Sequence, residues 1–215
     1  MIYKRFTSGT IASCTYILAD EFTKEAVMID PGYTQKEADV FIEEENLTLK
    51  YIIDTHGHAD HIHNNAYFKT KYGSEILIHP LDANYLENPN MNLSEYLGYA
   101  LQSPPADRLV NDGDEIKFGR EILTVHHTPG HTPGSISLSR DGAWFVGDLV
   151  FNGSVGRTDL TGGDADLLMK TLKEKIINLP EETKIYSGHG YYETTIKEQK
   201  RVNPFFLNLM GGQDE

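Results

Sequence analysis

Runs of apolar and β-branched residues alternate along this chain with three stretches of helical spacing. Apolar positions recur three and four residues apart in 34–46 and 163–179, which predicts a helix in each, and 62–72 is predicted as a third helix. The dipeptides Gly119-Arg120 and Asp141-Gly142 separate strand-like runs and predict two hairpins. The predicted strands cover residues 2–6, 15–18, 26–29, 49–53, 75–78, 115–118, 121–127, 135–139, 143–146 and 184–186.

The predicted strands and helices therefore form two successive sets along the chain, and residues 49–78 have a β-α-β pattern. We therefore expect a protein of the α/β class. No internal repeat or Ser/Gly-rich linker separates the sets, and 215 residues suffice for one large core. We therefore expect a single domain over residues 1–215. The pattern weakens over 88–108 into Asn, Pro, Ser and Tyr, which predicts an irregular excursion. Whether this excursion is a lid over a site or a plain surface loop stays open.

The most informative segment is Ile52-Ile53-Asp54-Thr55-His56-Gly57-His58-Ala59-Asp60-His61, which places three imidazoles and a carboxylate directly after a strand-like run. Imidazole and carboxylate are ligands for a borderline divalent cation such as zinc. His56 and His58, two positions apart, are predicted to face one point, and Asp60 and His61 a second. Four ligands exceed what one tetrahedral ion with an open position requires, so the segment indicates two metal ions.

Three later loops repeat this arrangement, each with a ligand-type residue in a Gly-containing turn just beyond a strand-like run. The loop 128–135 contains His131, Asp148 follows Gly147, and the loop 187–190 contains His189. Glycine lets the backbone approach an ion closely, and proline holds a loop rigid.

Taken together, these residues resemble the pattern of the metallo-β-lactamase superfamily, which is HxHxDH followed by His, Asp and His at strand ends. The resemblance spans nearly the whole chain and implies a four-layer αβ/βα sandwich. It implies two divalent metals, with zinc expected and iron or manganese as alternatives. The implied ligands are His56, His58 and His131 for the first metal and Asp60, His61 and His189 for the second, with Asp148 bridging both.

Two cations that share a carboxylate can hold a bridging water whose lowered pKa yields hydroxide at neutral pH, and they polarise a carbonyl group. This chemistry suits metal-dependent hydrolysis of an activated acyl bond. Asp60 is expected to be catalytic as well, because it can orient the hydroxide or carry a proton.

The stretches 147–159 and 188–206 are similar to compact bacterial glyoxalase II-type hydrolases, which cleave S-acyl glutathione thioesters. The similarity implies a small-molecule thioester substrate, with Arg157 near the glutathione moiety and Tyr191 near a substrate-contacting tyrosine. For Arg157, a salt bridge to a nearby aspartate is the structural alternative. The larger enzymes use a carboxy-terminal helical domain to contact glutathione, whereas about 25 residues follow His189 here. Dependence on glutathione therefore stays open.

Several alternatives stay open. A persulfide dioxygenase shares the fold but uses one mononuclear iron, which His56, His131 and Asp148 would bind here. A lactonase keeps the same seven ligands. A non-catalytic metal-binding protein is disfavoured, because binding alone does not require a complete two-metal set. An antibiotic hydrolase is disfavoured because β-lactamases of the commonest subclass have Cys in place of Asp148.

Other polar residues receive structural interpretations. Asp30 and Asp54 are predicted to hold ligating imidazoles, which usually donate their second N–H to a carboxylate or carbonyl, although turn capping accounts equally well for Asp30. We expect His63 on the outer face of the following helix. His79, His126 and His127 are expected to be structural.

Charge and composition narrow the partners and the compartment. A net charge of -13 without a basic cluster disfavours nucleic acid or an anionic membrane surface as partner. No apolar stretch approaches the roughly 18 residues that suggest a membrane span, and the amino terminus shows no signal peptide. The single cysteine, Cys14, fits a reducing compartment, so we expect a cytoplasmic protein. The sequence does not reveal the oligomeric state.

Overall fold

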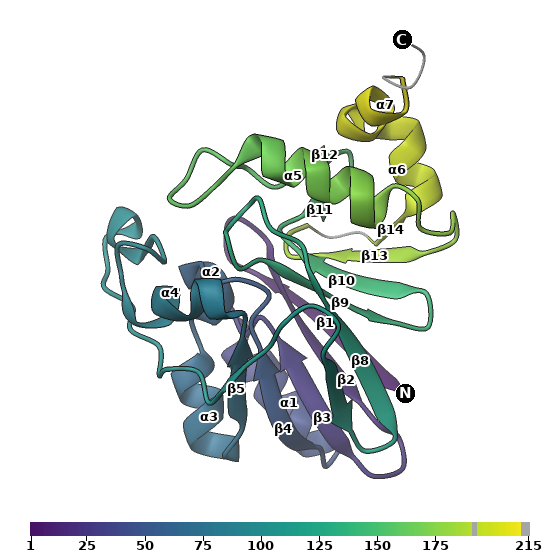
Figure 1. Ribbon diagram of the computed structural model, residues 1–215. Helices are drawn as coiled ribbons and strands as arrows, with labels where there is room; N and C mark the ends of the chain where they lie inside the picture. The colour runs from purple at the N-terminus through teal and green to yellow at the C-terminus, as the bar shows by residue number, and fades with distance from the viewer. Residues whose placement is uncertain (191–192, 212–215) are drawn as a thin grey trace.

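The computed structural model describes residues 1–190 and 193–211, and its strands form two six-stranded sheets that face each other (Figure 1). The first sheet has the order β1-β2-β3-β4-β5-β6, with β1 (Ile2–Ser8), β2 (Ser13–Ala19), β3 (Glu25–Ile29), β4 (Thr48–Ile53), β5 (Glu75–Ile78) and β6 (Arg108–Leu109). The second sheet has the order β14-β13-β10-β9-β8-β7, with β7 (Glu115–Phe118), β8 (Glu121–His127), β9 (Ile136–Arg140), β10 (Ala143–Gly147), β13 (Lys184–Ser187) and β14 (Thr194–Thr195). A separate hairpin pairs β11 (Val150–Phe151) with β12 (Ser154–Val155).

Helices cover the outer face of each sheet, which confirms the four-layer αβ/βα sandwich (Figure 1). The first sheet is covered by α1 (Gln35–Glu44) and α3 (Asn65–Tyr72). The second sheet is covered by α5 (Ala165–Thr171), its π-helical continuation η3 (Leu172–Ile176), α6 (Ile196–Val202) and α7 (Pro204–Gly211). The loops contain α2 (Ala59–Ile62), α4 (Ala83–Glu87) and the 3₁₀ turns η1 (Pro80–Asp82) and η2 (Ser94–Leu97). Over the described part of the chain, no helix is both long and apolar enough to traverse a bilayer.

Strand β2 shows how the layers are built, because successive side chains of a strand point to opposite faces. Tyr16 packs in the apolar core between the two sheets, whereas Ile17 packs with Ile42 of α1 in the core beneath the helices. All seven residues of β2 are buried, as expected for a strand covered on both faces. A third apolar cluster, which includes Trp144 and Leu168, joins the second sheet to its own helices.

The strands that precede the predicted ligands end at one edge of the sandwich. Strands β3 and β4 are parallel, and so are β10 and β13. Since β9 is antiparallel to both β8 and β10, β8 ends at the same edge as β10. Three backbone hydrogen bonds connect the two halves there: Ile136 N donates to Thr55 O (2.8 Å), Cys14 N donates to Gly188 O (2.7 Å), and Gly190 N donates to Ala12 O (3.0 Å). Loops from both sheets therefore meet at this edge.

The ten predicted strands are all present, with bounds that differ by a few residues. The helix predicted at 62–72 is present as α3, but it begins three residues later, because a short separate helix, α2, ends at Ile62 and residues 63–64 lie between the two. The N–H of Asn64 donates to Pro31 O (2.8 Å) instead of to a carbonyl of its own helix, which interrupts the helical hydrogen bonds. The short elements β6, β11, β12, β14 and α4 and the helices α6 and α7 were not predicted.

Asp20, at the end of β2, connects the two sheets at the opposite edge. Its carboxylate is buried and accepts hydrogen bonds from the backbone N–H groups of Phe22 (2.9 Å) and Arg120 (2.7 Å) and from the Arg120 guanidinium (3.1 Å). The hydrogen bond from Phe22, together with those from Arg120, outweighs burial and holds the pKa of Asp20 well below its ordinary value.

We predict that Asp20→Asn lowers the free energy of unfolding, because the amide has one acceptor oxygen and no charge for Arg120. A lowered pKa in the folded state means that the stabilising effect is complete above the unfolded pKa of about 3.9 and is lost as the pH falls through and below it. The difference in unfolding free energy between wild type and variant should therefore be constant near pH 7 and clearly smaller near pH 3, as measured by urea unfolding. Asp141→Asn, at a side chain that is 79% exposed, is the control. An equal difference at both pH values would contradict the prediction.

Candidate metal centre

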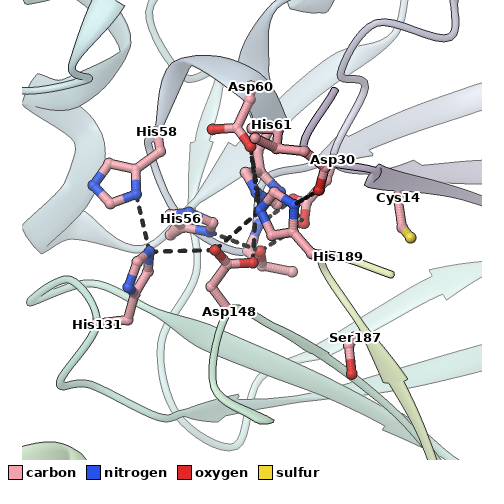
Figure 2. A network of polar contacts seen from close by, with 12 residues as sticks. Cys14, Asp30, His56, His58, Asp60, His61, His131, Asp148, Ser187 and His189 are labelled. Carbon is pink, nitrogen blue, oxygen red and sulfur yellow. Dashed lines mark hydrogen bonds and ion pairs between the residues drawn. The ribbon is translucent and has the colours of Figure 1, made fainter. Parts of the chain in front are cut away.

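Imidazole and carboxylate side chains from both sheets point toward one another at the edge where the ligand-bearing strands end (Figure 2). Four of them come from the loop after β4 and from α2. The others follow β8, β10 and β13. The structure thus brings together all seven residues predicted from the sequence: His56, His58, Asp60, His61, His131, Asp148 and His189.

Potential ligand atoms within 4.8 Å of one another form three groups. Two of these groups contain predicted ligands only, and we call them the first and the second cluster; the third group joins Asp30 to His56 and His61. In the first cluster, His58 Nδ1 lies 2.9 Å from His131 Nε2. In the second cluster, His61 Nε2 lies 3.2 Å from His189 Nε2. The first cluster contains His56, His58 and His131, and the second contains Asp60, His61 and His189.

Asp148 lies between the two clusters. Its Oδ2 atom is 3.5 Å from His131 Nε2 in the first cluster and 3.2 Å from His189 Nε2 in the second. Its Oδ1 atom is 3.5 Å from His61 Nε2. One carboxylate therefore faces both clusters, which is the position that a bridging ligand requires.

The donor atoms of the clusters fit divalent cations. The buried atoms His56 Nε2 and Asp148 Oδ1 have no hydrogen-bond partner among the described residues. Leaving a buried polar atom without a partner costs about 1–3 kcal/mol, and a cation would remove that cost. A set of imidazoles and carboxylates suits zinc, iron or manganese. The residues present therefore fit a pair of such ions.

In three of the five imidazole rings, the nitrogen that points away from the clusters donates to an oxygen acceptor of the protein. Such hydrogen bonds fix the ring orientation and leave the other nitrogen free for a metal. The three rings with these contacts are His131, whose Nδ1 donates to Arg157 O (2.7 Å), His189, whose Nδ1 donates to Ile11 O (2.8 Å), and His61, whose Nδ1 donates to Asp30 Oδ2 (3.1 Å). The predicted contact between Asp30 and an imidazole of the centre is therefore present, and that imidazole is His61.

The corresponding prediction for Asp54 is wrong. Its carboxyl group points toward α3 and accepts a hydrogen bond from Asn65 Nδ2 (2.8 Å), and it contacts neither cluster. Burial, together with the nearby charge of Asp30, raises the pKa of Asp54 well above its ordinary value.

Asp82, at the end of η1, is a positioning residue that the sequence interpretation missed. Its Oδ2 atom accepts hydrogen bonds from Gly57 N (3.0 Å) and Thr132 Oγ1 (2.7 Å), and its Oδ1 atom accepts one from Gly134 N (2.6 Å). One buried carboxylate thus ties the loop of His56 and His58 to the loop of His131. Its position just beyond β5 repeats the pattern of the predicted ligands, and this signal was available in the sequence.

The remaining histidines lie outside both clusters. The prediction that His63 lies on an outer helix face is wrong, because α2 ends before it and its ring packs 4.6 Å from the Tyr33 ring. His79 and His127 stack on each other at 4.1 Å, and His126 stacks on Trp144 at 4.2 Å. These three have the structural roles that we expected.

Two glycines allow the close approach of the loops. Gly147 has φ +50°, and a side chain there would overlap Thr55. A side chain at Gly188 would overlap Asp148 Oδ1 and the His61 ring. Any other residue would therefore separate the loops of the second sheet from those of the first.

The two clusters differ in their electrostatics. Burial and the neighbouring imidazoles lower the pKa of His56 well below its ordinary value, and they lower the pKa of His58 to about 3. Burial also acts against protonation of His189, but Asp148 and Asp60 outweigh it and raise the pKa of His189 to about 10. In the first cluster His56 and His58 thus favour the neutral form, whereas the carboxylates around the second cluster favour a positive charge on His189.

A cavity of about 870 Å³ is lined by residues of both clusters and by the predicted substrate anchor Arg157. The Arg157 guanidinium is 61% exposed and donates from Nε and Nη2 to the two carboxylate oxygens of Asp159 (2.7 and 2.8 Å). Its role as a substrate anchor stays a prediction. Tyr191, the other predicted substrate contact, lies outside the described residues.

The sequence model of the metallo-beta-lactamase superfamily matches residues 9–189. Among similar proteins, the "Probable metallo-hydrolase YqgX" of Bacillus subtilis (strain 168) is 35% identical over 95% of this chain and 97% of its own. "Hydroxyacylglutathione hydrolase GloC" of Haemophilus influenzae is 34% identical over 90% and 92%. The mitochondrial "Persulfide dioxygenase ETHE1" of Homo sapiens is 35% identical over 93% and 77%.

Two solved structures resemble the whole fold. That of the BLEG-1 B3 metallo-beta-lactamase has a TM-score of 0.89 at 36% identity, covering 95% of this chain and 99% of its own. That of TTHA1623, in a di-iron-bound form, has a TM-score of 0.83 at 33% identity, covering 94% and 99%. Both similarities confirm the fold class.

We predict that Asp82→Asn weakens metal binding by about 10- to 100-fold, because the amide cannot accept on both sides and the loops of His58 and His131 lose their common acceptor. Competition with a chromophoric chelator measures the affinity. Asp54→Asn is a matched control, since it changes an equally buried carboxyl group that contacts neither cluster. Equal metal affinity in Asp82→Asn and wild type would contradict the prediction.

Proposed function

Because the chain belongs to the metallo-beta-lactamase superfamily, we propose that it is a binuclear metal-dependent hydrolase of S-acyl glutathione or related thioesters. Two adjoining ligand clusters, with Asp148 between them and one cavity in front of them, carry this proposal. The similarity to a hydroxyacylglutathione hydrolase supports the substrate class.

Under this proposal the metal ligands are those predicted from the sequence: His56, His58 and His131 for one cation, Asp60, His61 and His189 for the other, and Asp148 for both. Two divalent cations held by these residues would supply a bound water of lowered pKa and would polarise a substrate carbonyl. Zinc is the proposed metal. The di-iron form of TTHA1623 supports iron as the first alternative, and manganese is the second.

Asp60 is proposed to act on the attacking water as well as on the metal. It lines the cavity, and its Oδ2 atom lies 3.2 Å from both His61 Nε2 and His189 Nε2. Burial opposes ionisation of this carboxyl group, but His61 and His189 outweigh it and hold the pKa of Asp60 well below its ordinary value. Asp60 is therefore a carboxylate at neutral pH, able to accept a hydrogen bond from the water and to orient it.

The proposed partner of the protein is a small-molecule thioester substrate, and we propose that the reaction occurs in the cytoplasm.

Two other activities have specific support. Similarity to ETHE1 supports persulfide oxidation, for which His56, His131 and Asp148 would hold a single iron. Similarity to BLEG-1 supports β-lactam hydrolysis, which Asp148 led us to disfavour.

We predict that protein stripped by a chelator is inactive and that zinc restores hydrolysis of S-acyl glutathiones, with metal content near two ions per chain. His58→Ala should lose metal and activity, because the first cluster then has two imidazoles. His126→Ala, whose ring lies outside both clusters, is the control.

A different outcome would identify an alternative activity. One iron per chain with oxygen uptake on glutathione persulfide would overturn the hydrolase proposal in favour of a dioxygenase. Turnover of a penicillin without turnover of any thioester would overturn it in favour of a β-lactamase.

We predict that Arg157→Ala lowers kcat/KM for a glutathione thioester by about 1.4- to five-fold through KM, because an exposed charge contact is worth roughly 0.2–1 kcal/mol. The same acyl group on N-acetylcysteamine, which has no carboxylate, is the control substrate and should show no such loss. Equal kinetics of wild type and variant with both thiols would exclude Arg157 as an anchor.

A further inference from the structure

Large apolar side chains border the candidate metal centre although they are well exposed to solvent. Ile11 is 54% exposed, Tyr96 is 77% exposed and Leu97 is 56% exposed, and all three line the cavity. Leu93 and Phe151 line it as well. Exposed apolar side chains that gather around one cavity indicate a ligand that covers them. We call these five residues the apolar wall.

The part of the wall in 88–108 is held in place. Asn92 is fully buried, and its side-chain Nδ2 donates to Tyr85 O and Leu101 O (both 3.0 Å). Its backbone carbonyl accepts from Ala59 N (2.9 Å) beside His58. These bonds hold the next residue, Leu93, at φ +69°, a left-handed conformation that is unfavourable for leucine. The segment is therefore tied by hydrogen bonds to the loop of the first cluster, and the strained residue Leu93 lies where it lines the cavity.

The rest of the wall adjoins the second cluster. The carbonyl of Ile11 accepts the hydrogen bond from His189 Nδ1 (2.8 Å), and the Phe151 ring lies 5.8 Å from the His189 ring. Apolar residues thus flank both clusters, next to the place where a substrate carbonyl would be attacked.

Charged groups are few in the same cavity. Among the described residues that line it, the charged side chains other than the predicted ligands are Arg157 and Asp159, which pair with each other. This pair offers one cation and one anion to the charged ends of a substrate. The apolar wall offers neither, so it suits hydrocarbon.

Building on the proposed thioester hydrolysis, we propose that the substrate has an apolar acyl group of several carbons, and that the apolar wall binds this group while the Arg157–Asp159 pair faces the thiol moiety. The apolar wall lies beside the proposed metal ligands. The substrate carbonyl would react there, so the carbons of its acyl group would lie against the wall. A short hydroxyacyl group would leave the wall exposed to water and would therefore be a poorer substrate.

The test compares S-acetyl-, S-lactoyl-, S-butyryl-, S-hexanoyl- and S-octanoylglutathione with the metal-reconstituted protein. Full burial of a methylene corresponds to roughly a three- to four-fold change, so we expect kcat/KM to rise about two- to four-fold per methylene until the wall is covered. Leu97→Ser and Tyr96→Ser should each reduce the hexanoyl-to-acetyl ratio of kcat/KM by about three- to ten-fold. Both side chains are more than half exposed, so the fold does not depend on them.

Leu109→Ser is the matched control, because Leu109 is 49% exposed and lies outside the cavity, and this variant should keep the wild-type ratio. Two results would contradict binding of the acyl group by the apolar wall and leave the thioesterase proposal intact. One is a kcat/KM that is independent of acyl chain length. The other is a hexanoyl-to-acetyl ratio of kcat/KM that is unchanged in Leu97→Ser and Tyr96→Ser. Absence of turnover with every thioester would overturn both proposals.

Discussion

The contacts of one buried carboxylate, Asp148, organise the rest of this structure. An ionised group that is only 9% exposed is costly unless positive or hydrogen-bonding groups surround it. Here the surrounding groups are imidazoles from loops of both sheets. His61 follows β4 of the first sheet, whereas His131 and His189 follow β8 and β13 of the second sheet. The two sheets must therefore end at the same edge for this charge to be compensated. A pair of cations would complete the compensation, because they would also occupy nitrogen and oxygen atoms that have no partner among the residues the structure describes.

Much of the surrounding architecture keeps these groups in position. Backbone hydrogen bonds between the sheets fix the loops, glycines at 147 and 188 permit their approach, and Asp82 ties the two loops of the first cluster together. The far edge has its own connection through Asp20 and Arg120. The centre is thus held by a rigid scaffold rather than by the ligands alone, which favours a preformed geometry for metal binding.

The same preformed geometry extends to the mouth of the cavity. The segment that contains Leu93 showed a weak pattern in the sequence because its apolar residues do not follow the period of a helix or a strand. Its conformation depends on Asn92, which bonds to the backbone of distant residues, and on the contact between the hydroxyl groups of Tyr33 and Tyr99 (2.9 Å). Tertiary contacts therefore place this segment beside the candidate metal centre, and such contacts cannot be predicted from a local sequence pattern.

The sequence by itself determined the ten main strands, the fold class and the seven residues that meet at the centre, because strand periodicity and closely spaced ligand residues are local properties. Only the tertiary structure decided which polar residues support that centre. Asp54 and Asp82 both lie near strand ends, yet the first turns toward α3 and the second joins two ligand loops. Likewise, the sequence contained Leu93, Tyr96 and Leu97 without indicating a cavity. The physical reason is that side-chain direction beyond a strand depends on long-range hydrogen bonds and packing between the two sheets, whereas the strands themselves depend on neighbours in sequence.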